Sequence, residues 1–147
     1  MSSARRARVY QKLQAASHCV QKTADRLVQE AGPLTTSQAA ALSVVAGFAS
    51  CNQRMIASQL GLNESAVTAM VTRLIRDGFL TRERSKTDAR TWLLTLTDSG
   101  REALQSVNGP FAEINDRLEA VLTEAEINQL ADMLKRVADT FGEAEQS

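Results

Sequence analysis

Apolar residues recur at every third or fourth position along most of this chain, a spacing that predicts amphipathic helices. The first run predicts one long helix over about residues 5–31, which ends at Gly32-Pro33. Thr35 and Gln38 have the spacing of a capping box and predict the start of a second helix. The apolar positions of the first helix are Val9, Leu13, Ala16, Val20, Ala24, Leu27 and Ala31.

Two further helices are predicted on either side of a tight turn. Asn52 can cap the shorter helix, and Gly61 tolerates the left-handed backbone conformation that ends helices. Asn63 can cap the next helix, over about residues 64–77, and Gly78 follows its end. At about 100° per residue, this helix has an apolar face and an opposite face of mostly small side chains. The apolar face comprises Ala66, Val67, Met70, Val71, Leu74 and Ile75, and the opposite face comprises Ser65, Thr68, Ala69, Thr72 and Arg76.

A β-hairpin is predicted next, because alternation of apolar and polar residues replaces the helical spacing. We expect residues 79–84 to form one strand, residues 85–90 a polar loop, and residues 91–96 a returning strand that is buried on at least one face. Two helices joined by a tight turn and followed at once by a hairpin are typical of a winged helix-turn-helix.

Two more apolar runs follow the hairpin and predict helices at the C-terminal end. Thr97 can cap the first of them, with Asp98 favourably placed in its first turn. Asn108-Gly109-Pro110 interrupts this run, and because a proline removes an amide and crowds the preceding turn, we expect a kink or a short break there. The fold class is therefore mainly α, with six helices and a small antiparallel β wing. The two runs comprise Leu104, Val107, Phe111, Ile114, Leu118 and Val121, and then Ile127, Leu130, Leu134, Val137 and Phe141.

Composition excludes several classes of protein. The 147 residues suffice to bury a sizeable core without disulfides or metal. No apolar run is long enough for a membrane span, and the Arg-rich start, residues 5–8, lacks the apolar stretch of a secretory signal, so we expect a cytoplasmic protein. Cys19, Cys51 and His18 supply too few ligands for an ordinary zinc site or a disulfide framework, so we expect no cofactor.

Charge is unevenly distributed although the formal net charge is zero. Residues 70–92 carry six basic and three acidic side chains, whereas residues 102–147 carry three basic and ten acidic ones. A basic patch on the hairpin and on the helix before it is what contact with phosphates requires. A solvated surface of mixed charge would give the same counts and stays an alternative.

The small side chains of the predicted 64–77 helix indicate DNA as a partner. Serine, threonine and alanine let a backbone approach base edges closely, with hydroxyls as hydrogen-bonding groups and methyls able to touch thymine. A surface helix that happens to be rich in threonine is the alternative. We expect contacts to bases from Ser65, Thr68, Ala69, Thr72 and Arg76, and contacts to phosphates from Arg54 and Arg73.

The loop of the hairpin adds a second candidate contact. Arg84, Lys86 and Arg90 cluster at its tip. A tip that bears arginines can enter the narrow, electronegative minor groove beside the site read by the helix. Asp88 either holds the Arg90 guanidinium in place by a charge-assisted contact or merely makes the turn.

Six short motifs occur in a characteristic order, and in them the chain resembles the MarR family of bacterial winged-helix regulators over nearly its whole length. The family often has arginine where this chain has Ala69. Base readout here would therefore depend more on Arg76, on hydroxyls and on DNA shape. The motifs are Leu34-Thr35-Thr36-Ser37-Gln38, Gly61-Leu62, Ser65-Ala66-Val67-Thr68, Gly78-Phe79-Leu80-Thr81-Arg82, Asp88-Ala89-Arg90 and Leu96-Thr97-Asp98-Ser99-Gly100.

The resemblance implies a function and a set of roles. It implies a homodimer that binds a pseudo-palindromic operator in double-stranded DNA, usually as a repressor released by a small ligand or by oxidation. It also implies that Ser65, Thr68 and Thr72 face the major groove. By the same analogy, Asp88 orients Arg90 in the minor groove.

The outer helices are the expected source of the dimer. Residues 5–31 and 98–141 carry more apolar surface than a small winged-helix core over residues 34–97 can cover, and a second copy is the simplest way to bury it. We expect a single MarR-like domain over residues 1–147, with the two reading helices of the dimer about 34 Å apart. A monomer whose outer helices form an intrachain bundle is the alternative.

No residue of the sequence identifies an effector, although the resemblance implies a small aromatic or anionic one. His18, Cys19 and Cys51 are weak candidates for a ligand or sensing site, and a solvated histidine and inert thiols explain them as well. Redox sensing by Cys19 ranks below ligand sensing, because the family's peroxide sensors would pair such a cysteine with nearby tyrosines and this chain has only Tyr10.

Two other classes of protein remain as alternatives. A winged helix can serve as a protein-interaction module whose wing meets an acidic partner, and salt-dependent DNA binding would separate the two. An enzyme is not expected, because the sequence shows no nucleophile–base pair, metal cluster or phosphate-binding loop.

Overall fold

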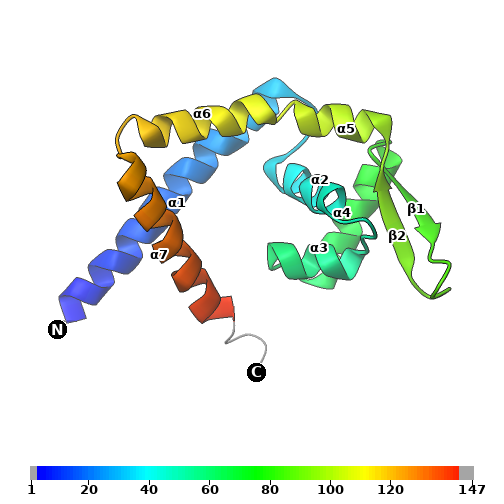
Figure 1. Ribbon diagram of the computed structural model, residues 1–147, viewed down its shortest axis with the longest axis horizontal. Coiled ribbons are helices and arrows are strands. Elements are labelled where there is room, and N and C mark those ends of the chain that lie inside the picture. Colours follow the sequence, from blue (N-terminus) through cyan, green and yellow to red (C-terminus); the bar gives the residue numbers. More distant parts are fainter. Residues whose placement is uncertain (1–2, 143–147) are drawn as a thin grey trace. The chain divides into compact units, whose positions relative to one another are not determined.

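The computed structural model describes residues 3–142, with side chains described from residue 8 onward (Figure 1). The Arg-rich start, residues 5–8, thus lies mostly outside the described side chains. The described part contains seven helices and one two-stranded antiparallel sheet, which matches the predicted mainly α fold class. The elements are α1 (Ser3–Ala31), α2 (Thr36–Gly47), α3 (Gln53–Leu60), α4 (Glu64–Arg76), β1 (Leu80–Arg84), β2 (Trp92–Leu96), α5 (Asp98–Gln105), α6 (Asn108–Glu119) and α7 (Glu124–Gly142).

The chain divides into two compact units, the first ending at Pro110 and the second beginning at Phe111. The first unit contains α1 to α5 and the hairpin, and the second contains most of α6 and all of α7. The winged-helix elements therefore all belong to the first unit.

The predicted helix caps are confirmed. Thr35 and Gln38 form the capping box at the start of α2, each side chain accepting a hydrogen bond from the other residue's backbone amide. Asn52 and Asn63 cap α3 and α4, with their side-chain oxygens accepting from the amide three residues on at 3.0 and 2.8 Å. Gly61 ends α3 with φ of 63°, so the turn between these helices uses the left-handed conformation that glycine tolerates.

The core of the first unit lies where α2, α3, α4 and the hairpin meet. Leu42, Ile56, Leu74 and Leu80, one from each of these elements, are fully buried. Near its C-terminal end, α1 adds Val28, which is also fully buried. Because the apolar side of α4 is committed to this core, its opposite side is left for a partner.

The hairpin is tied to its surroundings at two points. The amide of Leu94 in β2 donates to the carbonyl oxygen of Cys51, just before α3, at 2.7 Å. At the other end, the Thr97 hydroxyl donates to the carbonyl oxygen of Gly78 at 2.6 Å and accepts from the amide of Gly100 at 2.9 Å. These bonds fix the root of the hairpin relative to α3, α4 and α5, and Figure 1 shows its loop projecting away from α5.

One packing expectation differs from the structure, and one expected helix break is present. Ala66, predicted on the buried side of α4, is exposed, because it lies in the first turn beyond the edge of the core. The short break expected in the helix after the hairpin is present and divides it into α5 and α6, so the described residues form seven helices where six were predicted. The break covers residues 106–107, just before the predicted interruption, and Pro110 falls in the first turn of α6, where its missing amide removes no helical hydrogen bond.

The outer helices expose large apolar side chains. In α1, Val9 and Tyr10 are 68% and 65% exposed, although both lie on or beside the predicted apolar stripe. In the second unit, no residue of α7 is buried, and Val121 and Phe141 are 76% and 71% exposed. Among the described helices, none combines the length and the apolar character needed to cross a lipid bilayer.

Candidate nucleic-acid interface

The outward side of α4 presents the side chains that the sequence predicted. Ser65, Thr68, Ala69 and Thr72 are all exposed. The Thr68 and Thr72 hydroxyls donate to the backbone oxygens four residues earlier at 2.9 and 2.8 Å, and the Ser65 hydroxyl donates to the side chain of Asn63 at 2.9 Å. Since each hydroxyl hydrogen is engaged within the chain, these groups offer acceptor lone pairs to a partner.

Gln53 joins this surface, although sequence reasoning missed it. Its side-chain amide donates to the Thr68 hydroxyl at 2.9 Å and so links the start of α3 to the outward side of α4. No sequence signal could have found this contact, because it joins residues that lie 15 positions apart on two different helices.

A groove of about 460 Å³ separates the N-terminal ends of α3 and α4 from the wing. It brings together four of the predicted site residues, Arg54, Thr68, Asp88 and Arg90. The groove is also lined by Asn52, Gln53, Glu64, Thr91 and Trp92.

Arg54 lies at the mouth of this groove in a weak ion pair. Its Nε atom lies 3.7 Å from Oε1 of Glu64, and the two side chains are 87% and 73% exposed. Ion pairs this exposed contribute little, so Arg54 can leave Glu64 for a phosphate at small cost.

The far end of α4 carries the other two predicted cations. Arg73 is exposed and lines a shallow groove with Ala69 and the N-terminal residues of α2, and it makes no ion pair within the described part of the chain. Arg76 pairs with Asp77 at 3.2 Å on the surface. Arg73 is thus the freer of the two for contact with an anion.

The turn of the wing is closed by hydrogen bonds of Asp88. Its two carboxylate oxygens accept from the backbone amide of Arg90 and from the hydroxyl of Thr91, each at 3.0 Å. No ion pair joins Asp88 to the Arg90 guanidinium in the described residues. The structure therefore shows the turn-making alternative, in which Asp88 shapes the backbone beneath Arg90 rather than holding its guanidinium.

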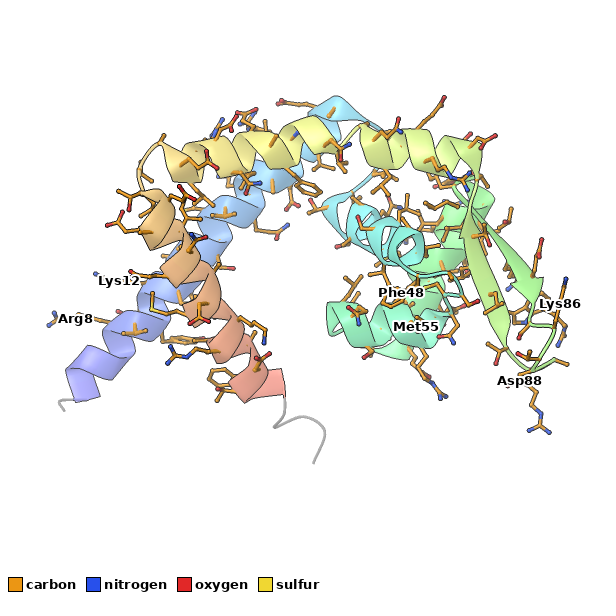
Figure 2. All side chains as sticks on the ribbon, viewed as in Figure 1. Arg8, Lys12, Phe48, Met55, Lys86 and Asp88 are labelled. Atoms are coloured by element: carbon orange, nitrogen blue, oxygen red, sulfur yellow. The ribbon has the colours of Figure 1, made fainter. Side chains whose placement is uncertain are left out.

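The cations of the wing do not all stand free at its tip as predicted. The Arg84 guanidinium lies over the Trp92 ring, 4.6 Å from its centroid, and donates to the carbonyl oxygen of Ala89. Lys86 and Arg90 are exposed, and Figure 2 shows Lys86 and Asp88 near the end of the hairpin. Arg84 is thus held within the wing by these two contacts. The sequence predicted a cation at this position but not the groups that it contacts.

The candidate sensing residues are not brought together. His18 and Cys19 are exposed on α1, whereas Cys51 is 1% exposed beside β2. Burial raises the pKa of the Cys51 thiol, so that group stays protonated and unreactive at neutral pH. The described residues contain no cluster of three or more potential metal ligands.

Comparisons with known proteins agree with this geometry. A model of the MarR family matches residues 34–92. The HTH-type transcriptional regulator BilQ of Clostridium symbiosum is 32% identical over 90 residues, which cover 61% of this chain and 62% of that protein. The chain spans about three fifths of the length of the first curated relatives that it matches. These relatives are named as transcriptional regulators.

Solved structures confirm the winged-helix fold. The transcriptional repressor CouR, bound to a 23-mer DNA duplex, is 30% identical with a TM-score of 0.80, over 86% of this chain and 89% of that chain. The PcaV regulator of Streptomyces coelicolor, in complex with its natural ligand, is 28% identical with a TM-score of 0.72, over 89% of each chain.

Proposed function

Since this chain belongs to the MarR family, we propose that it is a DNA-binding transcriptional regulator, a homodimeric repressor of a pseudo-palindromic operator that a small ligand releases. The observation that carries the proposal is one continuous surface in the first unit. It consists of the small-residue side of α4, the groove beside it, and a wing with exposed cations. Such a surface fits a duplex, whose major groove admits a helix and whose minor groove admits an arginine.

In the proposed complex, α4 lies in the major groove. The hydroxyls of Ser65, Thr68 and Thr72 accept hydrogen bonds from base amino groups, because their own hydrogens are engaged within the protein. Adenine and cytosine present such amino groups in the major groove. Ala69 permits close approach of the helix and offers a methyl group to thymine.

The arginines around α4 hold the phosphate backbone. Arg73 needs to break no ion pair in the described structure, and Arg54 gives up only an exposed one. Arg76 lies at the end of the reading side, where exchange of Asp77 for a base edge or a phosphate is cheap at the surface. These contacts fix register and affinity more than sequence preference.

The wing supplies the minor-groove contact. Arg90 inserts its guanidinium, and Lys86 neutralises a phosphate beside it. Asp88 contributes by closing the turn through the Arg90 amide, so its negative charge is partly satisfied before DNA arrives.

The exposed apolar side chains of the outer helices support the homodimer. Val9 and Tyr10 in α1 and Phe141 in α7 are each more than three fifths exposed in one chain. Removal of such apolar side chains from water by a second chain favours association. A twofold pair would place two α4 helices on successive major grooves, about 34 Å apart.

The proposal of ligand release is supported by the solved PcaV complex with its natural ligand. A small aromatic or anionic effector is the class proposed for this chain. Because the thiol of Cys19 is exposed, release from DNA by oxidation is the second candidate. A reducing agent in the binding assay should reverse release by oxidation but not release by a ligand.

Selection of duplexes from a random library, followed by binding of the selected operator across a series of salt concentrations, tests the proposal. We expect retention of a pseudo-palindromic sequence by a dimer, with an affinity that falls steeply as salt rises. Thr72→Val removes a hydrogen-bond acceptor with little change in the shape of the side chain. It should weaken binding to the operator more than binding to a random duplex. A folded protein that retains no duplex at low salt would contradict DNA binding and favour a protein-interaction module.

A further inference from the structure

The wing contains an aromatic side chain whose ring lies close to two arginine guanidinium groups. The Cζ atoms of Arg82 and Arg84 lie 4.9 and 4.6 Å from the centroid of the Trp92 ring. Arg84 is the direct cross-strand partner of Trp92, whereas Arg82 pairs with Leu94. Since directly paired and alternate residues of a hairpin share one face, all three side chains lie on the face that Leu94 continues into the core.

Arg84 differs from Arg82 in a second contact. Its Nη1 atom donates to the carbonyl oxygen of Ala89, five residues along the loop. Arg82 has no such bond to the loop in the described structure. The Arg84 guanidinium therefore joins the stacked Trp92 ring to the residue that immediately precedes Arg90.

The rest of the loop is closed from the other side. Ser85 donates its amide to the carbonyl oxygen of Thr91 at 2.9 Å, and Asp88 accepts from the amide of Arg90 at 3.0 Å. Together with the Arg84 bond, these contacts engage the backbone on both sides of Arg90. The loop is thus ordered before any partner arrives.

We propose that Arg84, held against Trp92, is a positioning residue that fixes the wing loop and thereby presents Arg90, and that it does not itself contact DNA. The effect on DNA binding rests on the proposed function. The ordering of the wing loop by Arg84, which is the structural half of the inference, concerns the free protein alone. An ordered loop loses less conformational freedom on binding, so its affinity is higher than that of a loose loop with the same charges.

The role follows from the chemistry of arginine. A guanidinium is planar, so it can stack on an indole ring while its edge donates hydrogen bonds. A lysine at position 84 would keep the charge but lose the stacked plane and the directed bond. To reach a phosphate, Arg84 would have to give up its contacts with Trp92 and with the Ala89 carbonyl oxygen. The side chains of Lys86 and Arg90 have no such contacts to break in the described structure.

Hydrogen exchange in the free protein tests the structural half. In the Arg84→Gln and Arg84→Lys variants, the Arg90 amide should exchange faster than in the parent chain, because the Ala89 carbonyl is no longer held. Arg82→Gln is the matched control, since it removes a cation from the same ring without touching the loop, and it should leave that exchange unchanged. Unchanged exchange in both Arg84 variants would overturn the inference whether or not the protein binds DNA.

Operator binding tests the other half. Arg84→Gln should weaken binding about three- to tenfold, the range expected for ordering one loop side chain. The slope of log K against log salt should stay as in the parent chain. In an Arg90→Ala background, the added effect should shrink below about twofold, because the presented group is gone. Trp92→Leu should act like Arg84→Gln, and Trp92→Phe, which keeps a ring face, should restore most of the affinity.

A direct contact gives a different pattern. If Arg84 touched a phosphate, Arg84→Gln would lower the salt slope by about 0.9 for each contact, and its effect would add in full to that of Arg90→Ala. That pattern would overturn the positioning role while leaving the proposed DNA binding intact. Failure of the parent chain to bind any duplex would instead refute the proposed function, and the exchange experiment would still decide the loop assignment.

Discussion

Replacement of Arg90 by alanine removes the proposed minor-groove contact with almost no change in the folded chain. The side chain is exposed and makes no ion pair in the described part of the structure. The hydrogen bond to Asp88 comes from the backbone amide at this position, which alanine keeps. We therefore expect the free energy of unfolding to change by less than about 0.5 kcal/mol.

The loss in DNA binding should be much larger. A well-placed arginine contact in a groove contributes about 1–3 kcal/mol, so Arg90→Ala should raise the Kd for the operator about 5- to 150-fold for each wing that is engaged. The substitution should not disrupt the turn of the wing. The hydrogen bond between Asp88 and Thr91 that helps to close this turn does not involve the Arg90 side chain. The effect is thus assignable to the guanidinium.

Fluorescence anisotropy with the selected operator duplex measures this loss, and thermal melting checks the fold. Arg101→Ala is the matched control, because it removes the same charge from α5, where Arg101 pairs with Asp98 at 3.1 Å. The control should bind with nearly unchanged affinity. An Arg90→Ala protein that melts like its parent and binds the operator equally well would refute the assignment of the wing to the minor groove.

Three further predictions follow from particular contacts. Arg73→Ala should weaken binding to all duplexes alike and lower the salt slope by about 0.9 per phosphate lost, and a loss confined to one operator base would contradict its phosphate role. Gly100→Ala should lower the free energy of unfolding by about 1–3 kcal/mol in denaturant titrations, because its Cβ would overlap a backbone oxygen just before β1, whereas Gly109→Ala has open space and should be neutral. A thiol reagent at neutral pH should label Cys19 and spare Cys51, whose pKa is raised by burial, until denaturant is added; native labelling of both would contradict that packing.

Local chemistry made most of the fold predictable. Thr35, Asn52, Asn63 and Thr97 cap the helices where the sequence placed them, because a cap depends on residues within one turn of it. The exposed side of α4 was predictable for a related reason, since helical periodicity alone separates its two faces. The error at Ala66 arose at the end of the helix, where periodicity gives the direction of a side chain but not how far the core extends.

Contacts between separate elements were not predictable from the sequence. Gln53 in α3 donates a hydrogen bond to Thr68 in α4. Arg84 stacks on Trp92 and donates to a loop carbonyl oxygen. A long polar side chain has several partners of similar energy within reach, and only the folded backbone selects among them. The same ambiguity left two roles open for Asp88, of which the structure shows hydrogen bonding to the turn.

The proposed function requires a twofold pair of chains that holds one duplex. Sedimentation of the protein with the selected operator at low salt measures both halves of this claim at once. We expect free protein at twice the 16.0 kDa mass of one chain and a complex of two chains on one duplex, which dissociates as salt is raised. A single-chain species that leaves every duplex unbound would contradict this expectation.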